Sequence, residues 1–293
     1  MTRLNTFSPE AASLLAAASS LCFGLALITG RKGLAHLDAR SGAAVAIPIA
    51  TLLFALAAPL TISGAEFSLA GLLAFCGVGL VYPGVVTLLT FRSNAEVGPT
   101  VTAAVSGASP LAALAAAGLI LGEHIPSAAI VTSIAVAAGV AMISWQPGRG
   151  APARFPRRAL WWSIAGAGLR GLAQAAAKGA LMLWPNPFAA GLIGYVVSSG
   201  VVLAADRGRT RPAVPGKGRA WFAATGVLNG TAVLLMYAAL SNAPVSRVAP
   251  IVAAYPLVTT LVSAAVLCEE PLTWRTLAGV VLMVASVIYL VAS

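Results

Sequence analysis

The chain has 293 residues, of which 59% are hydrophobic and 9% are charged, and its formal net charge is +10. A soluble domain of ordinary composition has about 25% charged residues, so this composition excludes the ordinary soluble class and indicates a membrane protein. The basic residues fall in short loops between apolar runs, where membrane topology accounts for them, and we therefore expect no nucleic-acid partner.

Ten apolar runs follow one another along the chain. A helix that crosses the roughly 30 Å hydrocarbon core of a bilayer needs about 20 residues, and each run is close to that length. The predicted spans, in order, are residues 11–30, 41–62, 69–91, 97–121, 127–145, 159–183, 188–205, 220–240, 248–267 and 273–291. Residues 146–158 are rich in Pro, Gly and Arg, which is typical of a linker. We expect an all-α integral membrane protein with ten transmembrane helices.

Two stretches of the chain, residues 93–126 and 241–271, are near-copies of each other. Both begin with Ser-Asn-Ala, contain an inner proline, and end with a glutamate shortly before another proline. The inner prolines are 146 residues apart (256 − 110), and so are the glutamates (269 − 123). A fixed period indicates an internal repeat, and we predict two five-helix units, residues 1–146 and 147–293. Because five is odd, the second unit should be inverted relative to the first, as in many secondary transporters.

The inner prolines and the glutamates of the repeat each allow a structural and a functional interpretation. Pro110 and Pro256 lie inside the fourth and ninth spans, where each should remove a backbone hydrogen bond and kink its helix. Such kinks are candidate gating points, although prolines are also common in membrane helices. Glu123 and Glu269 precede the fifth and tenth spans, where a carboxylate favours the positive end of the helix dipole. We expect structural capping of those spans, with proton coupling as the alternative.

The sixth span carries the strongest polar signal. Arg170, Gln174 and Lys178 are spaced by four, which places them on one helix face. Arg170 lies about 12 Å along the helix from Lys178, and a cation at that depth should face the interior or a cavity. No acidic residue lies in the middle of a span to pair with it. Arg170 either binds a substrate carboxylate or phosphate, or snorkels or bonds to backbone carbonyls.

Other polar side chains are predicted at membrane depth. Tyrosine, asparagine and hydroxyl groups can orient a small polar solute, while aromatic faces supply contact area. Each of them alone could equally serve only to hold packed helices together. These candidates are Tyr82, Ser106, Asn229, Tyr237, Tyr255, Thr259 and Ser263.

Glycine patterns and the absence of catalytic motifs argue against an enzyme. The GxGxxG match from Gly166 to Gly171 lies inside a span, not after a strand, so close helix packing explains it better than a dinucleotide. The pairs Gly118/Gly122 and Gly226/Gly230 are interpreted in the same way. The three cysteines show neither metal spacing nor an even count. We expect no metal, no cofactor and no catalytic residue.

The chain resembles the ten-span EamA-type members of the drug/metabolite transporter superfamily over nearly its whole length. The resemblance rests on the ten spans and on the twice-occurring pattern Ser-Asn-Ala, inner proline and closing glutamate, with Cys268 where the family usually has glycine. It implies a carrier in the bacterial inner membrane with a central cavity between the halves. Relatives export amino acids, including aromatic ones, or move other metabolites and drugs.

The distribution of basic residues predicts the orientation. Fourteen of the 18 Lys and Arg residues lie in the odd-numbered connections between spans. By the positive-inside rule these connections are cytoplasmic and both termini are outside, whereas the resembled families favour cytoplasmic termini.

We expect alternating-access export or exchange of an amino acid or similar carboxylate-bearing metabolite. The partners would be that solute and the lipid bilayer, with the protein a monomer or a homodimer. An intramembrane cation without a mid-span acid weighs against a cationic-drug/proton antiporter. A multidrug or cation efflux carrier, a lipid-linked-sugar flippase and an intramembrane enzyme are the alternatives.

Overall fold

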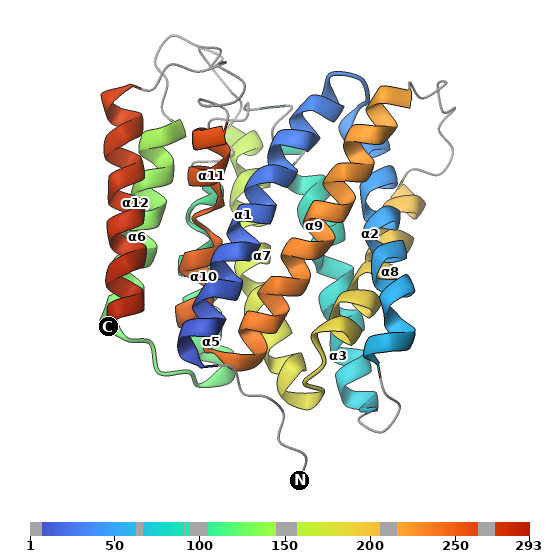
Figure 1. The fold of residues 1–293 in the computed structure, drawn as a ribbon, viewed down its shortest axis with the longest axis horizontal. Helices are drawn as coiled ribbons and strands as arrows, with labels where there is room; N and C mark the ends of the chain where they lie inside the picture. The colour runs from blue at the N-terminus through green and yellow to red at the C-terminus, as the bar shows by residue number, and fades with distance from the viewer. Residues whose placement is uncertain are drawn as a thin grey trace.

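The computed structural model describes residues 8–62, 67–90, 92–93, 96, 105–144, 157–205, 216–262 and 273–293, and these residues form helices and no strand. The elements in chain order are α1 (Pro9–Leu34), α2 (Ala39–Thr61), α3 (Leu69–Gly79), η2 (Leu80–Val85), α5 (Ser109–Leu121), α6 (Ser127–Ser144), α7 (Arg157–Leu183), α8 (Pro187–Ala205), α9 (Gly216–Asn242), α10 (Val245–Val252), α11 (Tyr255–Val262) and α12 (Trp274–Ala292) (Figure 1).

Helices occupy all ten predicted positions. Eight segments of the described chain are long and apolar enough to cross a bilayer. Of the other two, α5 covers only part of the predicted fourth span, because residues 97–104 lie outside the described residues, and α7 has 27 residues but carries charged groups. Large apolar side chains such as Leu56, Leu60 and Leu119 are 72%, 89% and 87% exposed, as expected of surface that faces lipid. The prediction of an all-α membrane protein is confirmed.

Helices of the first half of the chain pack mainly against helices of the second half. α1 runs along α9, α2 lies against α8 and α9, α5 lies against α7, and α6 pairs with α12 (Figure 1). Polar side chains join α1 to α9: the Ser19 hydroxyl donates to the Ala232 carbonyl at 2.7 Å, and the Thr29 and Thr225 hydroxyls lie 2.9 Å apart. The two halves therefore form one bundle.

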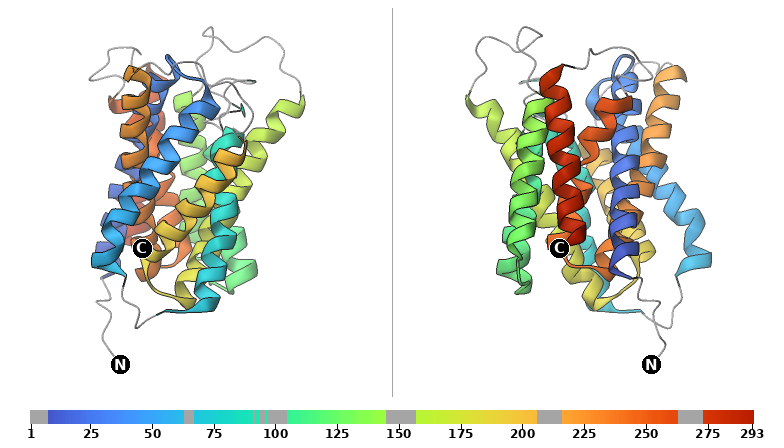
Figure 2. Two further views of the ribbon diagram at one scale, coloured as in Figure 1. Left: turned by 90° about the vertical axis from the view of Figure 1, so that its right-hand side faces the viewer. Right: turned by 60° about the vertical axis from the view of Figure 1, so that its left-hand side comes forward.

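The two ends of the bundle differ in charge. α1 begins and α12 ends at one end of the bundle, which we call the terminal end, and there α7 finishes and α10 begins (Figures 1 and 2). At the opposite end α1 finishes and α7, α9 and α12 begin, so that Lys32, Lys217 and Arg275 belong to it; we call it the basic end. α1 and α7 consequently run in opposite directions.

Pro110 and Pro256 stand at the start of a new helix, and the predicted kink within a continuous helix is wrong. α5 begins one residue before Pro110 and α11 one residue before Pro256, each after a two-residue turn. The Leu111 N–H donates to the Ala108 carbonyl at 3.1 Å, and the Leu257 N–H donates to the Ala254 carbonyl at 3.0 Å. A proline in the first helical turn has no intrahelical hydrogen bond to lose, so the chain breaks the helix cleanly where we expected it to bend.

Pro83 makes a further break, which the sequence analysis did not predict. Proline has no N–H, so the carbonyl of Gly79, four residues earlier, loses its helical donor. The Ser198 hydroxyl of α8 donates to that carbonyl at 2.7 Å and accepts from the Gly84 N–H at 3.1 Å. Tyr82 has an extended backbone at this point (φ −131°, ψ 132°). α8 therefore repairs the break and holds Tyr82 in a non-helical position.

Close helix packing at small residues is confirmed for two of the predicted glycines. A side-chain carbon at Gly226 would lie 2.3 Å from the Ala46 carbonyl oxygen of α2, and one at Gly171 would lie 2.5 Å from the Ala113 nitrogen of α5. The same carbon at Gly168 would meet nothing within 4 Å, so helix packing does not require that glycine.

Candidate functional site

Arg170 and four tyrosines come together inside the bundle from five different elements. The guanidinium carbon of Arg170 on α7 lies 5.9 Å from the centre of the Tyr82 ring. Tyr255, at the start of α11, is within electrostatic range of Tyr82, and so are Tyr195 of α8 and Tyr237 of α9. We call these five residues the central cluster. Three of the predicted tyrosines are thus brought together with the predicted arginine.

The central cluster is shielded from the surroundings. Tyr82, Tyr195 and Tyr237 are 6%, 1% and 2% exposed, whereas Arg170 and Tyr255 are half-buried. A guanidinium beside a tyrosine face is a favourable cation–π arrangement. Arg170 forms no ion pair with any described residue. The cluster therefore combines one positive charge with several phenol groups in a largely apolar setting, which suits recognition of a small anionic or zwitterionic group.

Tyr195 is the member that the sequence analysis missed. Its ring stacks on Phe54 of α2 with 5.4 Å between ring centres, and its carbonyl accepts a 3.1 Å hydrogen bond from Thr51. The criterion that selected Tyr82, a tyrosine in the middle of a predicted span, applied equally to Tyr195 and could have found it.

Three of the remaining predicted site residues are not tied to the central cluster by any side-chain hydrogen bond among the described residues. Gln174 is buried one turn along α7 from Arg170, Ser106 is buried just before the two-residue turn that precedes α5, and Asn229 is half-buried on α9. Among the described residues, no hydrogen bond or ring contact joins these three to the central cluster, so their roles stay predictions. Ser263 lies outside the described residues.

Thr259 is already engaged in helix packing. Its hydroxyl donates to the Gly24 carbonyl of α1 and to the Tyr255 carbonyl, both at 3.2 Å. A side-chain carbon at Gly24 would lie 2.7 Å from the Val258 side chain, so α1 and α11 touch at this point. Gly24 and Arg170 are one repeat apart (170 − 24 = 146). The first half therefore uses this position for close packing, where the second half carries a charge.

Glu123 caps a helix, as expected, but the capped helix is in the other half of the chain. Gly122 has a left-handed backbone (φ 64°) that ends α5, and the Glu123 N–H donates back to Ala117 at 3.2 Å. The turn directs the Glu123 carboxylate to α10, where it accepts from the Val245 N–H at 3.0 Å and the Ser246 N–H at 2.8 Å. The prediction that Glu123 caps the following span is wrong because the glycine cap reverses the chain direction first.

Lys178 caps a helix C-terminus close by. Its ammonium donates to the carbonyls of Leu240 and Ala243, at 2.6 and 3.1 Å, where α9 ends. A cation at this place complements the negative end of the helix dipole. Glu123 and Lys178 thus hold both sides of the short connection between α9 and α10.

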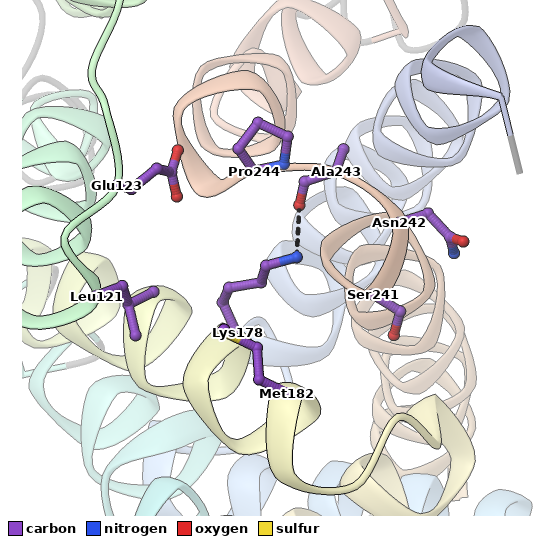
Figure 3. A pocket seen from close by; sticks show the side chains of 8 residues that line it. All are labelled: Leu121, Glu123, Lys178, Met182, Ser241, Asn242, Ala243 and Pro244. Carbon is purple, nitrogen blue, oxygen red and sulfur yellow. Dashed lines mark hydrogen bonds between the residues drawn. The ribbon is translucent and has the colours of Figure 1, made fainter. Parts of the chain in front are cut away.

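A pocket of about 390 Å³ opens between these two caps at the terminal end of the bundle. Figure 3 shows Glu123 and Lys178 on different walls of the pocket, with the Lys178 ammonium directed to the Ala243 carbonyl. The lining residues are Leu121, Glu123, Lys178, Met182, Ser241, Asn242, Ala243 and Pro244. The second copy of the glutamate, Glu269, lies outside the described residues.

The sequence profile of the EamA-like transporter family matches two segments of the chain, residues 11–145 and residues 157–292. The chain belongs to the EamA-like transporter family. The two matches coincide with the two halves that the 146-residue period indicates, so the resemblance drawn from the sequence is confirmed. The protein is therefore a multi-pass membrane transporter, and a family of transporters gives no indication of an enzyme.

Comparisons of fold and of whole sequences add less about this EamA-like transporter. A solved structure titled only "Crystal structure of protein" is similar to it with a TM-score of 0.80 and 15% sequence identity, covering 98% of this chain and 97% of that one. At this identity the likeness concerns the fold alone. No match was found among curated proteins.

Proposed function

We propose that this EamA-like transporter carries a small organic solute with a carboxylate, such as an amino acid, and that Arg170 binds the carboxylate. The observation that carries the proposal is the setting of Arg170. It lies mid-way along α7, half-buried against the Tyr82 ring, with no ion-pair partner among the described residues. A charge at membrane depth is costly, and a bound anionic group offsets that cost, whereas a cationic solute would add to it.

Three observations support transport by alternating access between two inverted repeats. The sequence repeats with a period of 146 residues, α1 and α7 run in opposite directions, and Pro110 and Pro256 mark equivalent helix breaks. Inverted repeats that rock about a midplane site are the usual plan of secondary transporters. In this proposal the α5 and α10–α11 segments move at the proline breaks, and the Glu123 and Lys178 caps hold the terminal end closed.

We place the protein in a bacterial inner membrane with the basic end in the cytoplasm. Two of the basic residues at the terminal end have local structural roles. Lys178 caps α9, and Arg247 donates to the Ser13 hydroxyl at 2.9 Å and to the Val291 carbonyl of α12 at 3.2 Å. These residues are therefore explained by helix capping and do not weaken the positive-inside argument. Reporter fusions at each terminus test this orientation.

Uptake into proteoliposomes tests the proposed solute class. The panel contains amino acids, peptides, sugars and cationic dyes, each with and without a pH gradient. We expect uptake of carboxylate-bearing solutes, a loss of at least about tenfold in Arg170→Ala, which corresponds to removing about 1.4 kcal/mol of binding, and partial retention in Arg170→Lys. Arg275→Ala, an exposed arginine beside Trp274 at the basic end, is the matched control. Uptake of dyes but not of amino acids, or normal uptake by Arg170→Ala, contradicts the proposal.

A further inference from the structure

The hydroxyl of Tyr195 is buried and has no hydrogen-bond partner among the described residues. In the described part of the chain, the buried side-chain atoms without a partner are this hydroxyl and the indole nitrogens of Trp162 and Trp184. A buried polar group without a partner is costly and uncommon in native proteins, so each case requires an explanation.

The two tryptophans have a structural explanation. Trp184 packs edge-on against Phe67 and leans on Phe75 at the junction of α7 and α8, and the face of Trp162 carries the Arg92 guanidinium at 4.1 Å. Trp162 lies near the start of α7 and Trp184 directly after its end, and neither belongs to the central cluster. Tyr195, in contrast, is near the middle of α8 and only 1% exposed.

The surroundings fix the ring of Tyr195 and leave its hydroxyl in the central cluster. Stacking on Phe54 and the Thr51 hydrogen bond to its carbonyl hold the residue on the α2 side. The hydroxyl end is within electrostatic range of Tyr82 and Tyr237. Tyr82 interacts both with Tyr195 and with Arg170, whose guanidinium carbon lies 5.9 Å from its ring centre. Arg170 and Tyr195 therefore share Tyr82 as a neighbour.

We infer that Tyr195 is a specificity-determining residue, whose hydroxyl bonds to a second polar group of the solute while Arg170 holds the carboxylate. The inference rests on the proposed function and deepens it. It assigns the solute to amino acids or similar carboxylates that carry a further hydroxyl group. A site built to bond such a group rejects an analogue without it, because the buried protein hydroxyl is then left unpaired.

Matched amino-acid pairs test this role in the full-length protein in proteoliposomes. L-threonine and L-valine have similar size but differ in a hydroxyl, as L-tyrosine and L-phenylalanine do. We expect the wild type to favour the hydroxylated member of at least one pair, and Tyr195→Phe to reduce that ratio of kcat/KM about 5- to 30-fold. Uptake of the member without the hydroxyl should stay within about twofold, because the substitution keeps the ring and its stacking.

Controls separate this role from a structural one. Tyr289→Phe, at a 53% exposed tyrosine of α12, should leave the ratio unchanged. Without solute, Tyr195→Phe should melt about 2–4 °C higher, because an unpaired buried hydroxyl is removed, and added solute should raise its melting temperature less than that of the wild type. An unchanged ratio in Tyr195→Phe, with uptake still dependent on Arg170, overturns this inference alone. Failure of the wild type to move any carboxylate solute overturns the proposed function, and this inference with it.

Discussion

The carboxylate of Glu123 accepts a 2.8 Å hydrogen bond from the backbone N–H of Ser246, which ties the end of α5 in the first repeat to the start of α10 in the second. The same carboxylate accepts from Val245 at 3.0 Å. α10 leads within eight residues to the break before Pro256. One side chain thus connects the repeat that carries Pro110 to the segment that carries Pro256.

Removing the Glu123 carboxylate should loosen the terminal end of the bundle. Val245 and Ser246 are 0% and 2% exposed, so Glu123→Ala leaves two buried N–H groups without acceptors, at a cost of about 1–3 kcal/mol each. We expect a lower melting temperature in detergent and faster labelling of Ser241→Cys, in the pocket wall, by a membrane-impermeant maleimide in a background without native cysteines. Glu10→Ala, at an exposed acid in the first turn of α1, is the control. Equal labelling rates in the two variants would argue against the closing role.

Lys178 should contribute to the same closure from the α9 side. Lys178→Met keeps the apolar length of the side chain but removes the donor for the carbonyls of Leu240 and Ala243, and we expect a loss of about 1–3 kcal/mol. Combined with Glu123→Ala, the effect should be smaller than the sum of the two single effects, because both caps hold one connection. Additive losses within about 0.5 kcal/mol would indicate that the two caps act independently.

Ser198 should be required for stability because Pro83 breaks the helix beside it. Ser198→Ala removes the hydroxyl that bridges the Gly79 carbonyl and the Gly84 N–H, which should cost about 1–3 kcal/mol. Adding Pro83→Ala restores an N–H for Gly79 and should recover part of that stability. Transport by the double variant should nevertheless be impaired, because Tyr82 would return to a regular helical position. Recovery of both stability and uptake in the double variant would show that the non-helical position of Tyr82 has no function.

Two glycine-to-alanine substitutions should have opposite effects on stability. At Gly226 the added carbon would meet the Ala46 carbonyl oxygen at 2.3 Å, so α9 and α2 must separate, and we expect a loss of about 1–3 kcal/mol, as in other overpacked sites. At Gly168 the carbon meets nothing within 4 Å, and alanine should stabilise α7 by about 0.5–1 kcal/mol through its better helix propensity. Thermal melting of both variants in one detergent compares them, and a destabilised Gly168→Ala would contradict the packing described for α7.

The sequence by itself determined the class of the protein. Long apolar runs, a 146-residue period and a charge bias between alternate loops depend only on local composition and spacing, and the helices occupy the predicted positions. The packing role predicted for Gly122 is wrong, because its left-handed backbone ends α5 and an added side-chain carbon there would meet nothing within 4 Å. The boundary between the two units near residue 146 stays a prediction, since residues 145–156 lie outside the described residues.

Only the tertiary structure decided which partners these residues have. Glu123 caps α10, more than 120 residues away in the chain (245 − 123), and Ser198 repairs the break at Pro83 from another helix. Tyr195 joins Arg170 and Tyr82 because α7, α8 and η2 pack together. Hydrogen bonds and aromatic contacts of this kind depend on how helices from the two halves interleave, and a local pattern carries no information about a partner in a distant helix.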